Sequence, residues 1–236
     1  MEISKGMEIV DLGLWIKKHK LLVFADFHIG FEEALNKQGV LIPRFQFKDI
    51  IQRLEKIFTK VNPDTIVVNG DIKHEFGRIS EQEWRETLKL IEFLAKHCKN
   101  LLLTKGNHDK ILGPIAKKRN IKDIPFYEEG DILIIHGDKI PNDISKYKTI
   151  IIGHEHPALS IQEGSRVEKF KCFLVGKYRR KTLIVLPSFN LVTEGTDVTR
   201  EKALSPFLKQ NLDNFEAYVV ADKVYKFGKL KNLRNS

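Results

Sequence analysis

The 236 residues suffice for one fair-sized domain, and a content of 42% hydrophobic and 30% charged residues excludes global disorder. Two cysteines exclude a disulfide framework, and no apolar run approaches the roughly 20 residues of a membrane helix. The net charge of +9 is typical of a protein with an anionic partner such as nucleic acid, or of a lysine-rich surface. The N-terminus carries no signal-peptide pattern, so we expect a cytoplasmic protein with a single domain over residues 1–236.

The first half of the chain alternates strand and helix patterns. Short apolar runs of the buried-strand type occupy residues 21–25, 65–68 and 100–104. Between them, residues 49–61 carry apolar side chains at helical spacing. Ser80 begins a capping-box pattern, S-E-Q-E, before a helix that we expect to end near His97. This alternation predicts a parallel sheet with crossover helices.

The second half has short strand patterns with little helix between them. They lie at residues 131–135, 149–152, 158–161, 170–175 and 182–186. Such a run indicates a second sheet that is antiparallel or mixed. We therefore expect an α/β fold in which two mixed sheets pack face to face with flanking helices.

Five of these strands end in turns that are rich in Asp, Asn and His. The turns are Asp26-Phe27-His28, Asn69-Gly70-Asp71, Gly106-Asn107-His108-Asp109, His136-Gly137-Asp138 and Gly153-His154-Glu155-His156. Ligands gather beyond the carboxyl ends of strands in open α/β sheets, so these side chains should form one shell. Carboxylate, amide oxygen and imidazole suit Mn, Fe, Zn or Ni. Ordinary turn preferences explain the glycines of the set but not its histidines.

From Asp26 to His156, the five turns resemble the ordered signature of the calcineurin-like metallophosphoesterase superfamily, which is D-x-H, G-D, G-N-H-[DE], H and G-H-x-H. The resemblance implies a four-layer α/β/β/α sandwich with two metal ions at one edge. The implied ligands are Asp26, His28, Asp71 and His156 for one ion, and Asp71, Asn107, His136 and His154 for the other. Asp71 would bridge the ions, which are expected to be manganese, with iron, zinc or nickel as alternatives.

The same resemblance implies that a hydroxide between the two ions attacks the phosphate in line. His108 would lie outside the ligand set, where it donates a proton to the leaving oxygen or stabilises its charge. For Asp109, we favour a cap on the following helix.

His74 distinguishes branches within the superfamily. The G-D-x-x-D-R-G segment of the protein serine/threonine phosphatases is absent, and Asp71-x-x-His74 instead resembles the G-D-x-x-H of DNA double-strand-break repair nucleases. In those enzymes this histidine helps to position the nucleic-acid backbone; the alternative is an ordinary turn residue. The chain has no room for a DNA-capping domain, and residues 186–190 and 195–198 resemble the compact SbcD-related, ligase-associated phosphoesterases.

The expected function is a phosphodiesterase or nuclease that acts on DNA, RNA or nucleotides, with a role in DNA repair and an ATPase or ligase as a conceivable partner. A phosphomonoesterase or cyclic-nucleotide phosphodiesterase is the alternative, and a metal-binding scaffold without catalysis is a third interpretation. No membrane partner is expected.

The most basic segment, residues 164–181, has two compatible interpretations. It could follow a nucleic-acid backbone with Tyr178 stacking on a base, or it could form a hairpin with a solvated basic turn. The tail from about 223 to 236 is basic and polar, and we expect it to fray. Core packing is expected for Trp15 and Trp84, and a core or semi-buried position for Cys98 and Cys172.

Overall fold

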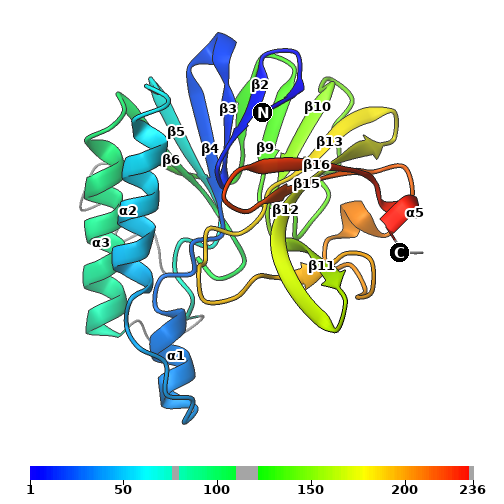
Figure 1. Ribbon diagram of the computed structural model, residues 1–236. Coiled ribbons are helices and arrows are strands. Elements are labelled where there is room, and N and C mark those ends of the chain that lie inside the picture. The colour runs from blue at the N-terminus through cyan, green and yellow to red at the C-terminus, as the bar shows by residue number, and fades with distance from the viewer. Residues whose placement is uncertain (76–79, 110–121, 234–236) are drawn as a thin grey trace.

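The computed structural model describes residues 1–75, 80–109 and 122–233. Figure 1 shows two sheets, with helices α2 and α3 lying side by side against one of them. The first sheet has the order β1-β2-β3-β4-β5-β6-β7. Its strands are β1 (Glu2–Ser4), β2 (Met7–Val10), β3 (Gly13–Ile16), β4 (Leu21–Ala25), β5 (Thr65–Asn69), β6 (Asn100–Thr104) and β7 (Lys122–Ile124).

The strands β4 to β7 are parallel, as the alternation of strands and helices predicted. The bounds of β4 and β6 are those expected from their apolar runs, and β5 extends one residue further, to Asn69. The antiparallel strands β1 to β3 were not predicted. They are three or four residues long, which is too short for a period of two to be distinct in the sequence.

Two of the crossover helices begin at side chains that accept backbone hydrogen bonds. Helix α3 (Glu81–Ala95) begins after Ser80, whose hydroxyl accepts from the Glu83 backbone as the capping box predicted. Helix α2 (Gln46–Phe58) begins three residues earlier than expected, because the carboxylate of Glu32 accepts the backbone N–H groups of Phe45 and Gln46. Glu32 belongs to the short helix α1 (Phe31–Lys37). Capping from a distant segment leaves no local sequence pattern.

The second sheet has the order β14-β11-β12-β13-β10-β9-β8, and β15 pairs with β12 and β16. Its strands are β8 (Tyr127–Glu129), β9 (Ile132–Ile135), β10 (Thr149–Ile152), β11 (Pro157–Glu163), β12 (Arg166–Tyr178), β13 (Lys181–Val185), β14 (Thr196–Asp197), β15 (Glu216–Val220) and β16 (Val224–Lys229). Because β9, β10 and β13 are parallel while β12 runs antiparallel to β13, this sheet is mixed.

Alternate residues of β10 show how the layers pack. Ile151 belongs to the core between the two sheets, together with Val67 of β5. Its neighbours Ile150 and Ile152 face the opposite side, where a second core includes Phe207 of the 3-10 helix η2 (Pro206–Leu208). The architecture is therefore α/β, with two mixed sheets packed face to face. Among the described residues, the second core, on the outer side of that sheet, contains residues of η2 and of a four-residue helix at Leu230–Leu233.

Two expectations for the basic segments were wrong. The tail does not fray over residues 224–233, because β16 pairs along β15 and helix α5 (Leu230–Leu233) buries Leu230 completely. Tyr178 is not available for base stacking, since its ring is buried and lies 5.0 Å from that of Phe207. The hairpin interpretation of residues 164–181 is confirmed, because β12 pairs antiparallel with both β11 and β13.

The other expected core residues are at least partly buried. Cys172 is fully buried, and Trp15, Trp84 and Cys98 are partly buried against the larger hydrophobic core, which also includes residues of helices α2 and α3. Within the described residues, no helix is long and apolar enough to cross a membrane.

Candidate metal centre

The ends of the two sheets meet through a few backbone and side-chain bonds. Asn69, at the end of β5, donates from its side chain to the carbonyl oxygen of Ile135 at the end of β9, at 2.9 Å. The backbone N–H of His154, after β10, donates to Asp26 Oδ2 at 2.8 Å. The turns that follow strands of both sheets therefore lie at one edge of the sandwich.

A first cluster contains Asp26, His28, Asp71 and His156. The Nε2 atoms of His28 and His156 are 3.2 Å apart. Asp26 Oδ2 lies 3.5 Å from His156 Nε2, and Asp71 Oδ2 lies 3.9 Å from His28 Nε2. Four polar side chains from three turns thus face one small volume.

A second cluster surrounds the Nε2 atom of His136. This atom lies 2.9 Å from Asn107 Oδ1 and 3.1 Å from His154 Nδ1. It is also 3.4 Å from Asp71 Oδ2, the oxygen that faces His28 in the first cluster. Asp71 is therefore shared between the two clusters, and all seven residues expected to bind metal come together.

The donor atoms fit divalent cations in spacing and in chemistry. Ligands bound at about 2.0–2.2 Å from one ion lie roughly 3–3.5 Å from each other, close to the distances in both clusters. Asp26 is fully buried and its Oδ1 accepts no hydrogen bond from the described residues. Burying such a carboxylate is costly without a compensating cation.

The pKa values of the buried groups also indicate that positive charge is needed at this site. Burial lowers the pKa of His136, but the carboxylates of Asp71 and Asp26 outweigh it and raise that pKa to about 9. Burial raises the pKa of Asp71, yet the net shift is downward because His136 and His28 favour its charged form. A proton on His136 thus supplies positive charge where a metal ion would supply more. Burial also keeps the pKa of His28 well below 6.5, which favours the neutral imidazole that binds metals.

The backbone is strained where these side chains originate. Positive φ angles occur at the non-glycine residues Asp26 (55°), His28 (47°), Asp71 (45°), His154 (65°) and His156 (51°). This left-handed region is costly for residues with a Cβ, and such strain concentrates at functional sites. Five of the seven expected ligands therefore have a conformation that the surrounding structure must enforce.

The glycines beside the ligands mainly make room for them. A Cβ on Gly106 would lie 2.0 Å from Asp71 Oδ1, and one on Gly153 would lie 2.6 Å from Asp26 Oδ2. Neither glycine has a positive φ, so close approach of the ligand, and not a left-handed turn, requires glycine there. At Gly70 both reasons apply, because its φ is 79° and its Cβ would lie 2.2 Å from His136 Nδ1.

His108 and His74 lie beside the two clusters. His108 Nδ1 is 2.5 Å from the carbonyl oxygen of His74, which can only accept, so Nδ1 carries the hydrogen. The other nitrogen, Nε2, faces Asp71 Oδ2 at 3.9 Å. The His74 ring lies between those of Phe31 and His108, at 4.5 and 5.5 Å, and burial lowers its pKa to about 4.

Two buried glutamates shape this edge without having been predicted to do so. Glu83 accepts the backbone N–H groups of His74 and Glu75, where the capping box led us to expect a bond back to the helix start. Glu155, between the two histidines of G-H-x-H, is fully buried. The only sequence signal for Glu155 was its position inside that motif. Asp109 accepts from the Gly106 backbone, and the helix that it was expected to cap lies outside the described residues.

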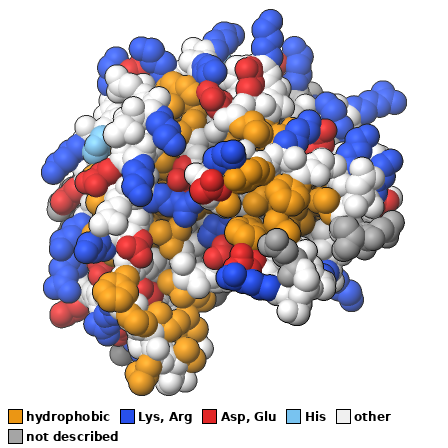
Figure 2. Space-filling model, viewed as in Figure 1, with side chains coloured by type: hydrophobic (Ala, Val, Ile, Leu, Met, Phe, Trp, Pro, Cys, Tyr) orange, Lys and Arg blue, Asp and Glu red, His pale blue; other side chains and the backbone are white. Residues whose placement is uncertain are grey.

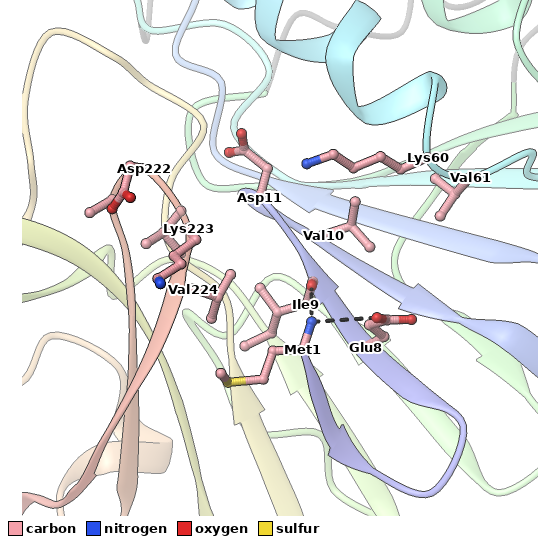
Figure 3. A pocket seen from close by; sticks show the side chains of 12 residues that line it. Met1, Glu8, Ile9, Val10, Asp11, Lys60, Val61, Asp222, Lys223 and Val224 are labelled. Carbon is pink, nitrogen blue, oxygen red and sulfur yellow. Dashed lines mark hydrogen bonds and ion pairs between the residues drawn. The ribbon is translucent and has the colours of Figure 1, made fainter.

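Several hollows on the surface lie away from the two clusters. Figure 3 shows one of about 360 Å³ between β2 and the β15–β16 turn, where the Met1 ammonium donates to Ile9 and Glu8. Its lining contains none of the histidines described above. On the face in Figure 2, lysines and arginines are spread widely instead of gathering over one element. Neither feature competes with the clusters as a site for chemistry.

Comparisons with known proteins bear on the family and the fold of the chain. The model of the calcineurin-like phosphoesterase family matches residues 19–211. The crystal structure of Pseudomonas putida nuclease MPE superposes with a TM-score of 0.65 at 16% identity, covering 92% of both chains. An Aquifex aeolicus protein of unknown function, AQ665, has a TM-score of 0.38 at 20% identity, covering 58% of this chain and 78% of that one. YfcE, a phosphoesterase from E. coli, has a TM-score of 0.39 at 12% identity, covering 86% of this chain and 88% of that one. A search of curated sequences found no match.

Proposed function

The chain belongs to the calcineurin-like phosphoesterase family, and we propose that it is a phosphodiesterase that cleaves nucleic acids or nucleotides with two metal ions. The observation that carries the proposal is the convergence of seven donor side chains, with one carboxylate, Asp71, shared between two clusters. Manganese is the metal we propose first, because the resemblance to the superfamily implies it; a donor set of imidazoles and oxygens without thiolates also suits iron, zinc or nickel.

The proposed ligand sets follow the two clusters. Asp26, His28, Asp71 and His156 would hold one ion; Asp71, Asn107, His136 and His154 would hold the other. When bound, two divalent ions lower the pKa of water and offset the charge that develops on a phosphoryl group. The buried, hydrogen-bonded side chains of Asp71 and Asp26 keep the donors in place before substrate arrives.

We assign proton transfer to His108. Its Nδ1 is fixed by the carbonyl oxygen of His74, so the ring cannot turn away and Nε2 faces the shared carboxylate. From there Nε2 can donate a proton to the leaving oxygen of the substrate. His74 orients His108 through this bond. Its own ring, kept neutral by burial, would contact a phosphate of the nucleic acid as a hydrogen-bonding group and not as a charge.

The nucleic-acid substrate is supported by the Asp71-x-x-His74 spacing and by the net charge of +9. The nuclease named among the solved structures shares the fold, which is compatible with this substrate but does not select it. A phosphomonoesterase is the second candidate, because the donor set alone would serve either reaction. A scaffold without catalysis is disfavoured by the presence of His108 beside the donors.

A matrix of metals and substrates tests the proposal. Metal-stripped protein is loaded with Mn, Mg, Zn, Ni or Fe and assayed on bis-p-nitrophenyl phosphate, p-nitrophenyl phosphate, single-stranded DNA and single-stranded RNA. We expect manganese to restore cleavage of the diester and of at least one nucleic acid. Turnover of the monoester alone would replace the proposal with the second candidate, and no turnover with any metal would refute it.

A further inference from the structure

We propose that Glu155 and Ser205 are positioning residues that hold the turn of His136 and the turn of His154 and His156 in one fixed relation. The inference rests on the proposed function, since it concerns residues that support the proposed donors. Neither residue belongs to the donor clusters, and Ser205 lies 49 positions or more from every histidine of the site in sequence.

Glu155 points away from the donors although it lies between two of them. Its Oε2 accepts the backbone N–H groups of Leu204 and Ser205, at 2.9 and 2.8 Å. The side chain is fully buried, and Oε1 accepts no hydrogen bond from the described residues. A buried carboxylate on a turn is an expensive anchor, so a role in fixing the turn accounts for it better than simple packing does.

Ser205 completes the link to the other turn. Its hydroxyl donates to the carbonyl oxygen of Gly137 at 2.7 Å, and Gly137 follows His136 directly. The backbone N–H of Ser205 therefore binds the β10–β11 turn while its side chain binds the turn after β9. Ser205 is fully buried, so bulk solvent does not compete for either bond.

The strain at the histidines explains why such an anchor is needed. His154 and His156 have φ angles of 65° and 51°, a region that surrounding contacts must over-determine. Glu155 lies between these two histidines, and its buried carboxylate binds the backbone of Leu204 and Ser205. Because His136 and His154 both face the second cluster, loss of the network should disturb that cluster more than the first.

Ser205→Ala is the less disruptive test, because it keeps both backbone bonds to Glu155 and removes the bond to Gly137 together with the long, 3.4 Å bond that the hydroxyl accepts from the Phe207 backbone. Glu155→Gln is a second variant of the same shape, which weakens both backbone bonds because a neutral amide oxygen is a weaker acceptor than a carboxylate. Thr199→Ala is the matched control, since Thr199 donates its hydroxyl to Asp197 at 2.6 Å in the same part of the chain but has no bond to a histidine turn.

The readout is manganese binding, measured by calorimetry and by electron paramagnetic resonance without substrate. Supporting contacts to metal ligands typically contribute 10- to 100-fold in affinity. We expect the second equivalent of manganese to bind at least 10-fold more weakly in both variants, and the spin-coupled signal of a manganese pair to give way to that of single ions. Thr199→Ala should match the parent.

Two results would overturn the inference: parental affinity and a parental pair signal in Ser205→Ala or Glu155→Gln, or a lower melting temperature with unchanged manganese binding. The second result would assign the network to stability alone. Failure of the proposed function is a separate outcome, because then the parent itself would show no coupled manganese pair.

Discussion

The replacement Gly106→Ala would test whether the glycine exists to admit Asp71. The new Cβ would lie 2.0 Å from Asp71 Oδ1 and 2.4 Å from the Asp71 backbone nitrogen, whereas real Cβ contacts keep at least 3.0 Å. The shared carboxylate must therefore move by about 1 Å or more. It would also weaken the 2.9 Å hydrogen bond that it accepts from the His108 backbone.

The size of the effect follows from that displacement. A misplacement of about 1 Å at a catalytic group costs on the order of 100-fold in rate, and crowding of a packed site costs about 1–3 kcal/mol of stability. We expect Gly106→Ala to fold, to lose about two orders of magnitude in kcat/KM on bis-p-nitrophenyl phosphate with manganese, and to bind less than two equivalents of the metal.

The control is Gly6→Ala, which also introduces a Cβ but meets nothing within 4 Å. Its φ of 75° makes alanine unfavourable by about 1–2 kcal/mol, so its loss of stability should match that of Gly106→Ala while its activity stays parental. Parental activity and metal content in Gly106→Ala would refute the argument that close approach to Asp71 requires glycine.

Three further results are expected. His108→Ala should lower kcat by about 10²–10⁴-fold with metal content nearly unchanged. The control is His97→Ala, which should match the parent; the Nδ1 atom of His97 also lies 2.8 Å from a backbone carbonyl oxygen. Equal rates in the two variants would reject the role of His108. Removal of metal with a chelator should lower Tm and manganese should restore it, because the ion binds the folded state; a Tm indifferent to manganese would contradict the site. Burial lowers the pKa of Lys171 to about 8, below the roughly 10.4 of unfolded lysine. Between pH values of about 8 and 10.4 the unfolded state therefore binds more protons than the folded state, and the free energy of unfolding rises with pH in that range. Lys171→Met should remove that rise in urea unfolding, and parallel curves for both proteins would disprove it.

The strands that carry the site were predictable because their signal is local. A parallel strand buried on both faces is a continuous apolar run, and Leu21–Ala25 is buried at all five positions. The polar turn that follows each run marks the strand end, and parallel strands bring these ends together. The same two facts yield both the fold and the cluster of donors.

The remaining features depend on contacts between distant segments. Residues 224–229 read as part of a fraying tail because that tail is basic and polar, yet β15 pairs with them from Val224 to Lys229. Ser205 has no sequence feature that connects it to His136, since its bond goes to a carbonyl oxygen that every residue possesses. The space that Gly106 leaves for Asp71 is likewise set by a residue from another turn.

The charge of the donor set connects the site to its substrate. Without metal, the carboxylates of Asp26 and Asp71 face a His136 whose raised pKa keeps it protonated near neutral pH, so the clusters carry a small negative charge. Two divalent cations would meet only these two carboxylates, because the other donors are neutral imidazoles and an amide. The loaded site would retain a positive surplus in a buried place of low dielectric, where it attracts an anion strongly. A purely structural metal site has no use for such a surplus, whereas a phosphate group of the substrate neutralises it.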